Sequence, residues 1–352
     1  MPDIADRVIV NQKIALKREM RMKNIFVGLG LFALMLVSVQ ASDCRPAPPD
    51  VAELVEIRPN YHTVRGPLAE FDPCHKSVEF SPPGGGLFGK KVEGKPPLVI
   101  LVHGGGGLGA LEKNMARALN RKGYATLVFD AYQMNNFYQG VSLFLTGMTN
   151  GGRQRMIYKA TFGAYQWAIV NPKIDTSKIF FHGVSNGGSV LLNIAGAVDP
   201  NHVKGVFAEG PSPAGIGMPH KINVPLRMIF GKLDNYGGKA EDDWMWQRIE
   251  PCFTLDHYRA APQGTAETCN RLVNAQSNSI TPYQWFEQQK ATGADIEVWF
   301  YENAAHGILA GPIDRGIRMY GGTVKRWGWT GASSAAAEKL IADMDRFISS
   351  AN

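Results

Sequence analysis

The chain has 352 residues, of which 45% are hydrophobic and 19% charged, so it holds enough apolar residues for one large core or two small ones and is not disordered throughout. Its formal net charge is +6, but residues 1–41 carry six of the 37 basic residues and three of the 31 acidic ones. The remainder has a net charge of about +3 and no basic cluster interleaved with aromatic residues, which argues against a nucleic-acid partner.

Residues 1–41 are predicted to form a signal peptide. Basic residues precede an uncharged apolar stretch from Ile25 to Val39, and Val39 and Ala41 are small residues at the positions that a signal peptidase recognises. The apolar stretch is shorter than the roughly 20 residues of a membrane span. A retained signal anchor stays the alternative, and only in that case do we expect contact with a membrane. We therefore expect a secreted or periplasmic protein.

The pattern of the chain changes near residue 97. Residues 42–96 are rich in proline and glycine and are interpreted as an N-terminal arm with at most a short strand or two, one of them around residues 77–80. Residues 97–352 alternate apolar runs with helical patterns, which indicates a mostly parallel sheet with helices on both faces. The predicted strands are Leu98–Val102, Ala125–Phe129, Lys178–His182, Val203–Ala208, Leu226–Phe230 and Ile296–Tyr301, and the predicted helices are Ala110–Lys122, Arg153–Val170 and Ser334–Ile348.

All the cysteines follow the predicted leader, in the part of the chain that would meet an oxidising compartment. Four cysteines allow three pairings. We expect the local ones, Cys44 with Cys74 and Cys252 with Cys269, each stabilising the fold by about 3 kcal/mol through restriction of the unfolded chain. Free buried thiols are the alternative. No cysteine spacing resembles a zinc site.

The segment Gly183-Val184-Ser185-Asn186-Gly187 joins a predicted strand to a predicted helix. A serine flanked by glycines at such a turn is typical of a nucleophile elbow. The sharp turn strains the serine backbone, and a side chain two residues before or after the serine would collide with the neighbouring strand and helix. We predict that the Ser185 hydroxyl lies exposed above the sheet and that the Asn186 N–H points toward the same space.

Functional groups of parallel sheets gather beyond the carboxyl ends of the strands. A His103-Gly104-Gly105 loop follows the first of these strands, Ser185 follows the elbow strand, and Asp234 and His306 each follow a later strand. The chain order of glycine loop, serine, aspartate and histidine is that of the α/β-hydrolases.

The segment from about residue 97 to 348 resembles the α/β-hydrolase fold, closest to its dienelactone hydrolase-like branch. The motifs that carry the resemblance are VILVHGGGGLG, GYATLVFDAY, IFFHGVSNGG, MIFGKLD and ENAAHGI. Dienelactone hydrolases proper have a cysteine nucleophile where this chain has Ser185, and a glutamate directly after the first-loop histidine where it has Gly104. The resemblance therefore implies a serine esterase-like mechanism.

The chemistry of acyl transfer gives these residues their expected roles. Ser185 is a weak nucleophile at neutral pH and needs a base, for which His306 is the candidate because a neutral imidazole can accept and return a proton. The backbone N–H groups of Asn186 and Gly105 are expected to bind the oxyanion.

Asp234 is expected to hold the imidazole in the right tautomer and to stabilise its cation. Glu209, Asp242 and Asp243 are alternatives for this acid, because they could also reach the sheet edge. Of the other histidines, His182 is interpreted as a core residue, and His103 is expected to brace its loop.

Gly104, Gly106 and Gly109 also spell GxGxxG, with Asp130 about 20 residues on, which is the dinucleotide-binding fingerprint. This alternative leaves Ser185 and the later strand ends unexplained. We therefore expect no cofactor and no metal.

Two segments over the strand ends, residues 132–152 and 235–292, are rich in aromatic residues. The longer one, residues 235–292, is interpreted as a partial lid insertion, which a Cys252–Cys269 bridge would pin. Aromatic residues there indicate an apolar or aromatic acyl or alcohol group in the substrate, with packing of the lid onto the body as the alternative. The residues expected to contact substrate are Tyr132, Phe137, Tyr138, Trp244 and Trp246.

The sequence thus predicts an exported serine hydrolase of the α/β-hydrolase fold that cleaves a carboxylic ester or lactone of a small molecule through a Ser-His-Asp triad and an acyl-enzyme. A serine peptidase or amidase on the same fold is one alternative, because both share the triad. A non-catalytic binding protein that keeps the fold is the other.

Overall fold

The computed structural model places most of the segment that the sequence assigns to the α/β domain, together with a short piece of the predicted arm. All of these residues belong to one compact unit. Among the described helices, none combines the length and the apolar character that a membrane span needs. The described residues are 71–84, 93–135, 150–211, 219, 221–236, 282–319 and 325–351.

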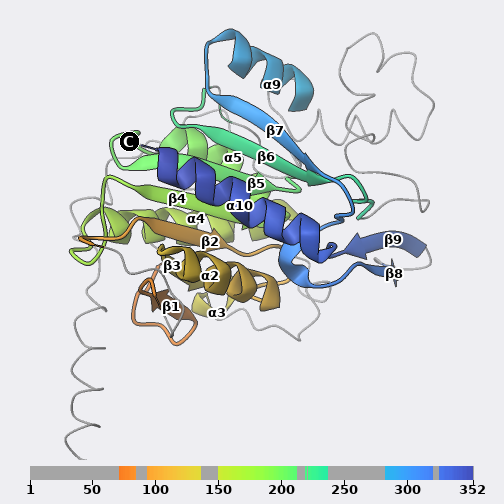
Figure 1. Ribbon diagram of the computed structural model, residues 1–352, viewed down its shortest axis with the longest axis horizontal. Helices are drawn as coiled ribbons and strands as arrows, with labels where there is room; N and C mark the ends of the chain where they lie inside the picture. Colours follow the sequence, from red (N-terminus) through yellow and green to blue (C-terminus); the bar gives the residue numbers. More distant parts are fainter. Residues whose placement is uncertain are drawn as a thin grey trace, which may run out of the picture. The chain divides into compact units, whose positions relative to one another are not determined.

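The centre of the fold is a mostly parallel sheet. In the described part of the chain its seven strands follow the order β1-β3-β2-β4-β5-β6-β7 (Figure 1). Every neighbouring pair is parallel except β1 and β3, which are antiparallel. The strands are β1 (Val78–Ser81), β2 (Leu98–Val102), β3 (Ala125–Phe129), β4 (Ile179–Val184), β5 (Val203–Glu209), β6 (Leu226–Gly231) and β7 (Ile296–Tyr301).

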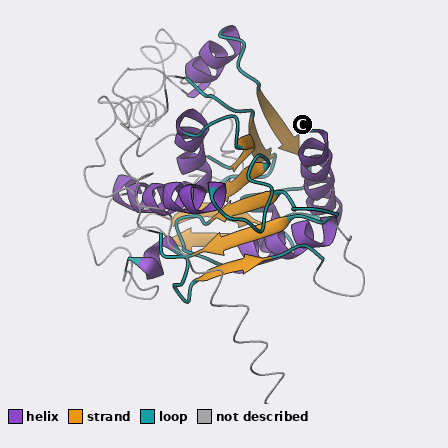
Figure 2. Ribbon diagram, turned by 90° about the vertical axis from the view of Figure 1, so that its left-hand side faces the viewer, coloured by secondary structure: helices purple, strands orange, loops and turns teal. Residues whose placement is uncertain are grey.

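Helices cover both faces of this sheet (Figure 2). Apolar side chains of α4 and α5 pack on one face, and those of α2 and α10 pack on the other. The predicted α/β class with a mostly parallel sheet is therefore confirmed. The helices are α2 (Ala110–Lys122), α3 (Ala131–Met134), α4 (Asn150–Ile169), α5 (Asn186–Ala197), α9 (Pro282–Ala291), the 3-10 helix η3 (Ile308–Ala310) and α10 (Ser334–Ser350).

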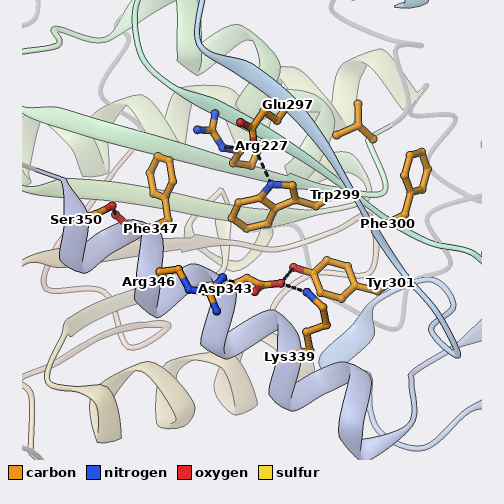
Figure 3. Close-up of a pocket in the computed structure, with 11 residues that line it drawn as sticks. Arg227, Glu297, Trp299, Phe300, Tyr301, Lys339, Asp343, Arg346, Phe347 and Ser350 are labelled. Carbon is orange, nitrogen blue, oxygen red and sulfur yellow. Dashed lines mark hydrogen bonds and ion pairs between the residues drawn. The ribbon is translucent and has the colours of Figure 1, made fainter.

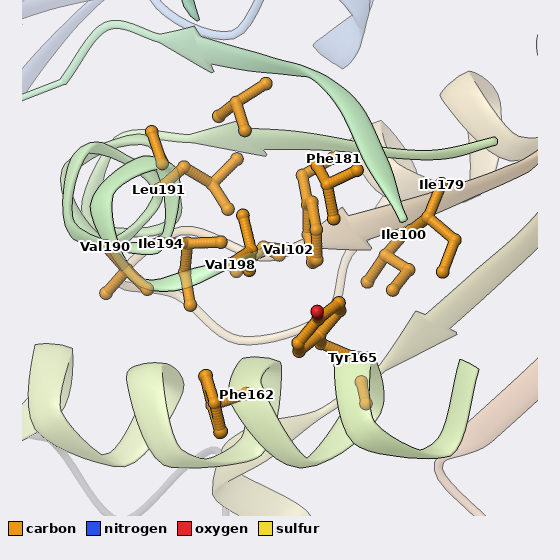
Figure 4. Close-up of a cluster of buried hydrophobic side chains, with 14 of the residues drawn as sticks. Ile100, Val102, Phe162, Tyr165, Ile179, Phe181, Val190, Leu191, Ile194 and Val198 are labelled. Atoms are coloured by element: carbon orange, nitrogen blue, oxygen red, sulfur yellow. The ribbon is translucent and has the colours of Figure 1, made fainter. Parts of the chain in front are cut away.

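The continuous apolar runs of the sequence form these strands because both sides of each inner strand are buried. In β2, Ile100 belongs to the core layer beneath α4 and α5, whereas Leu101 belongs to the layer beneath α2 and α10. Figure 4 shows the first layer, in which Phe181 of β4 meets Tyr165 of α4 with ring centroids 6.5 Å apart. A strand with two buried faces needs no polar alternation.

The strand order places a topological switch point between β2 and β4. From β2 the chain moves outward to β3 on one side, and it then returns to β4 on the other side of β2. Crevices at such points, beyond the carboxyl ends of the strands, are where ligands bind in open α/β sheets. The loop after β2 and the turn after β4 both lie there.

The boundaries of the predicted elements differ from the observed ones by a few residues. The strand β4 runs on to Val184, directly before the elbow, and β5 includes Glu209. The sequence patterns missed a hairpin of β8 (Asp314–Met319) and β9 (Lys325–Thr330), because its strands carry charged residues and glycine in place of an apolar run. Most of the predicted lid, residues 235–292, lies outside the described residues, and α9 forms its last part.

A groove of about 530 Å³ runs between β7 and α10 (Figure 3). Within it the Arg227 guanidinium lies 4.7 Å from the ring centroid of Phe347 and pairs with Asp295 at 2.6 Å. None of the residues that line the groove is a predicted site residue. The groove lies on the edge strand β7, and β5 and β6 separate this strand from the elbow strand β4.

Replacing Leu340 by Ala should test how much α10 contributes to the fold. Leu340 is fully buried in the core layer shared with α2. Its truncation removes apolar contacts and leaves a cavity, so we expect the free energy of unfolding to fall by about 3 kcal/mol in denaturant titration. The exposed neighbour Glu338 provides the control, since Glu338→Ala should change it by less than about 0.5 kcal/mol. Equal losses in both variants would contradict the assignment of this layer.

Candidate active site

The turn at Ser185 has the strain that the sequence predicts. Ser185 has φ 57° and ψ −118°, a backbone conformation that residues other than glycine rarely adopt. Its N–H donates to the Glu209 carbonyl oxygen at 2.9 Å, and its own carbonyl accepts from the Ser189 N–H at 2.9 Å. The turn is thus fastened to β5 on one side and to α5 on the other.

The two flanking glycines are required by space. A Cβ placed on Gly183 would lie 2.9 Å from the backbone carbon of Gly187, and one placed on Gly187 would lie 2.7 Å from the carbonyl oxygen of His103. Backbone atoms cannot move aside as a flexible side chain can. The predicted collisions at these two positions are confirmed.

His306 and Asp234 are joined by a hydrogen bond. Nδ1 of the imidazole lies 2.8 Å from Oδ2 of the carboxylate, and both side chains are buried. Because an ionised carboxylate only accepts hydrogen bonds, Nδ1 carries the proton and Nε2 is left with its lone pair. The second carboxylate oxygen accepts the Tyr236 N–H at 3.0 Å, and the Tyr236 ring stacks on the imidazole with centroids 4.4 Å apart.

Gly210 connects the imidazole to the serine turn. This glycine follows Glu209, whose carbonyl binds the Ser185 N–H, and it has a φ of 51°. A Cβ placed on it would lie 3.0 Å from Cε1 of His306 and 3.4 Å from Oδ2 of Asp234. The imidazole therefore lies over the end of β5, and β5 is the neighbour of β4, the strand that ends at the Ser185 turn.

Of the other carboxylates considered for this acid, Glu209 is the one that lies within the described residues. Glu209 accepts the Ile308 N–H at 2.6 Å and pairs with His182 at 3.0 Å. Asp242 and Asp243 lie outside the described residues.

The glycine loop after β2 packs directly against the elbow. A Cβ placed on Gly104 would lie 3.3 Å from Cβ of Ser185, and one on Gly105 would lie 2.9 Å from Nδ2 of Asn186. Asn186 also begins α5, so the positive end of the helix dipole points to this space. Gly105 and Asn186, the two predicted oxyanion donors, are therefore neighbours.

His103 braces this loop, as the sequence predicts. The Ala131 N–H donates to Nε2 of His103 at 3.0 Å, so Nδ1 carries the proton and donates to the Gly104 carbonyl at 2.7 Å. The neutral imidazole thus ties the loop after β2 to the start of α3. Tyr132 packs on its edge, with ring centroids 4.8 Å apart.

Tyr132 is almost completely buried, and burial raises the pKa of its hydroxyl to about 12, although the positive charge of Arg153 acts to lower it. The Asn186 side chain, which lies close to the Tyr132 hydroxyl, accepts a hydrogen bond from Nε2 of Gln154 at 3.2 Å. These contacts make Tyr132 part of the support of the loop, and its contact with substrate stays a prediction. The other expected substrate contacts, Phe137, Tyr138, Trp244 and Trp246, lie outside the described residues.

Asp130 anchors a loop and does not offer a ribose site. Its buried carboxylate accepts the N–H groups of Leu108, Tyr132 and Gln133 and the side-chain amide of Gln133. This leaves no exposed oxygen for the ribose of a dinucleotide. Within the described residues, no three His, Cys, Asp or Glu side chains come together to hold a metal ion.

The predicted disulfides stay predictions. Cys74 lies on an exposed turn before β1, and Cys44, Cys252 and Cys269 lie outside the described residues.

Three features of the site escaped the sequence patterns. The hairpin holds the backbone of His306, whose N–H donates to the carbonyl of Trp329 at 3.2 Å and whose carbonyl accepts from Gly331. Tyr236 stacks on the imidazole, and Gly210 makes room for it. Gly210 directly after an apolar strand was a usable signal, whereas the hairpin contact joins segments with no shared motif.

The strand order, the strained elbow and the groups at the strand ends together decide the fold. The chain has the α/β-hydrolase fold. No protein-family model matches the sequence, and no curated protein matches it either.

Solved structures similar to this chain include dienelactone hydrolases and related α/β-hydrolases. A dienelactone hydrolase from Anabaena variabilis is 14% identical over 78% of this chain and 91% of its own, with a TM-score of 0.44. A dienelactone hydrolase-like promiscuous phosphotriesterase from metagenomic libraries is 16% identical over 77% and 97%, with a TM-score of 0.47. Est1E from Butyrivibrio proteoclasticus, with ferulic acid bound, is 12% identical over 77% and 93%, with a TM-score of 0.39.

Replacing Gly187 by Ala should destabilise the elbow. The new Cβ would press on the backbone at the end of β2 and at the start of the loop that follows it, so we expect the free energy of unfolding to fall by about 2 kcal/mol or more. A matched control is Gly106→Ala, because a Cβ there meets nothing within 4 Å and φ is not positive. Thermal and denaturant unfolding should separate the two variants, and equal stability would contradict the close contact.

Proposed function

We propose that the protein is a serine hydrolase that cleaves a carboxylic ester or lactone of a small molecule through Ser185, His306 and Asp234 and an acyl-enzyme. The observation that carries the proposal is the 2.8 Å hydrogen bond between Nδ1 of His306 and the Asp234 carboxylate. This bond places the proton on Nδ1 and makes Nε2 the basic atom of the imidazole. The proposal needs no cofactor. The signal-peptide pattern supports export as part of the same proposal.

In the first half-reaction Oγ of Ser185 attacks the acyl carbon while Nε2 of His306 takes the hydroxyl proton. The carbonyl π electrons move to the oxygen, where the N–H groups of Asn186 and Gly105 and the start of α5 stabilise the negative charge. The imidazolium then gives its proton to the leaving alkoxide as the C–O bond breaks. In a lactone this alkoxide stays attached to the acyl group.

In the second half-reaction water repeats the attack on the acyl-enzyme. Nε2 of His306 takes a proton from the water, and the proton returns to Oγ of Ser185 as the ester bond to the enzyme breaks. Asp234 keeps its charge throughout and stabilises the imidazolium in both halves. Because the carboxylate is buried, its attraction to that cation is stronger than it would be in water.

Fluorophosphonate labelling of the full chain tests the nucleophile. We expect the probe to modify Ser185 and the protein to release p-nitrophenol from short-chain esters. Ser185→Ala should abolish both, and His306→Ala should lower ester turnover by about four orders of magnitude, because the serine loses its base.

The matched control is Ser177→Ala, since Ser177 lies on an exposed turn before β4. This variant should keep both properties. Labelling that survives Ser185→Ala would contradict the assignment of the nucleophile. A folded protein that neither reacts with the fluorophosphonate nor hydrolyses the esters would favour a non-catalytic binding protein. Hydrolysis of peptides or amides in preference to esters would favour the peptidase alternative.

Gly210→Ala tests whether the imidazole must occupy its observed place. The added Cβ would push on Cε1 and Nδ1 of His306, so we expect kcat to fall by about tenfold or more while KM changes by less than about twofold. Gly94→Ala is the control, because Gly94 also has a positive φ but its Cβ would meet nothing within 4 Å. An unchanged kcat in Gly210→Ala would contradict the proposed position of the base.

A further inference from the structure

A buried pair of ionisable side chains lies directly behind the proposed triad. Nε2 of His182 on β4 is 3.0 Å from Oε2 of Glu209 at the end of β5, and both side chains are about 2% exposed. Burying such a pair costs desolvation energy, which an apolar pair of similar size would not. The mechanism above uses neither side chain. Their place in the fold therefore needs its own account.

The second oxygen of Glu209 binds the loop that carries the base. Oε1 accepts the Ile308 N–H at 2.6 Å, and Ile308 begins η3 two residues after His306. Between them Gly307 has a φ of 70°, so the chain turns sharply at this point. The carboxylate thus holds the first N–H group of the turn that follows the imidazole.

The backbone of the same residue binds the nucleophile turn. The Glu209 carbonyl accepts the Ser185 N–H at 2.9 Å. A Cβ placed on Gly188 of α5 would lie 2.6 Å from this carbonyl oxygen, so the helix presses closely on it. One residue therefore contacts the serine turn through its main chain and the histidine turn through its side chain.

We propose that Glu209, braced by His182, is a positioning residue that sets the place of His306 relative to Ser185. The inference rests on the proposed hydrolase function. Asp234 orients the imidazole ring, and the hairpin binds the backbone of His306, while Glu209 links that backbone to the serine strand. His182 donates to the carboxylate and limits the directions in which it can turn.

Glu209→Gln separates this role from general packing, because it keeps the shape of the side chain. The amide oxygen can accept the Ile308 N–H, but the amide NH2 then faces Nε2 of His182, which can accept from it only after its proton has moved to Nδ1, and the charge of the carboxylate is removed. We expect kcat for p-nitrophenyl esters to fall by about tenfold or more, since a small displacement of a catalytic group has large effects on rate. KM should change by less than about twofold.

A double-mutant cycle on the full chain tests whether Glu209 acts through His306. In the His306→Ala background, Glu209→Gln should change the residual rate by less than about twofold, because the group it positions is gone. Asp345→Asn is the matched control, since Asp345 binds Tyr124 and Lys122 and neither belongs to the site. That control should lower stability without changing kcat in either background.

Substitution of His182 provides a second route if Glu209→Gln does not fold. His182→Gln keeps a donor for the carboxylate and should retain most of kcat, whereas His182→Leu should lose about tenfold. Equal rates in these two variants would overturn the bracing role.

Two results overturn the role of Glu209. One is a kcat of Glu209→Gln within about twofold of the wild-type value, and the other is an equal loss in the His306→Ala background. If the wild-type chain neither labels nor turns over, the proposed function fails first. A crystal structure of Glu209→Gln then decides the positioning separately, since an unmoved His306 ring overturns it.

Discussion

The strained turn at Ser185 is the constraint on which the site depends. Here the chain leaves a buried parallel strand and enters a helix within one residue, and this geometry forces a positive φ on a serine. The same geometry leaves no room for side chains at positions 183 and 187, which are both glycine, and it directs the start of α5 toward the space above the sheet. The strain is held by bonds to β5 and α5, so the surrounding fold maintains a conformation that the turn alone would not keep.

Parallel pairing then brings distant segments to this turn. The strands β2, β4, β5, β6 and β7 all end at one edge, and each is followed by a group of the site or its support. The switch point between β2 and β4 opens the space in which the glycine loop meets the elbow. His306 is held from three directions, because Asp234 binds its ring, Glu209 binds the loop after it and the hairpin strand β9 binds its backbone.

Two buried carboxylates at the carboxyl ends of the strands, Asp234 and Glu209, have different binding partners. Asp234 bonds to the imidazole, whereas Glu209 bonds to backbone and to His182. In a low-dielectric interior a carboxylate without partners would be costly, and each of these has partners on both oxygens. The separation explains how two acids can lie close to one histidine while a single one orients its ring.

The sequence by itself determined the strands β2 to β7, the helices α2, α4 and α10 and the glycine-flanked turn at Ser185, because continuous apolar runs and the spacing of Gly183, Ser185 and Gly187 are local properties. It also limited the acid to a few carboxylates after strand ends. Only the tertiary structure decided that Asp234, and not Glu209, bonds to His306. It also decided that the missing side chain of Gly210 leaves room for the His306 ring and that the hairpin binds the backbone of His306. These choices depend on which strands become neighbours and on contacts of about 3 Å between segments that are distant in the chain, such as Asp234 and His306, which are 72 residues apart, and no local pattern encodes them.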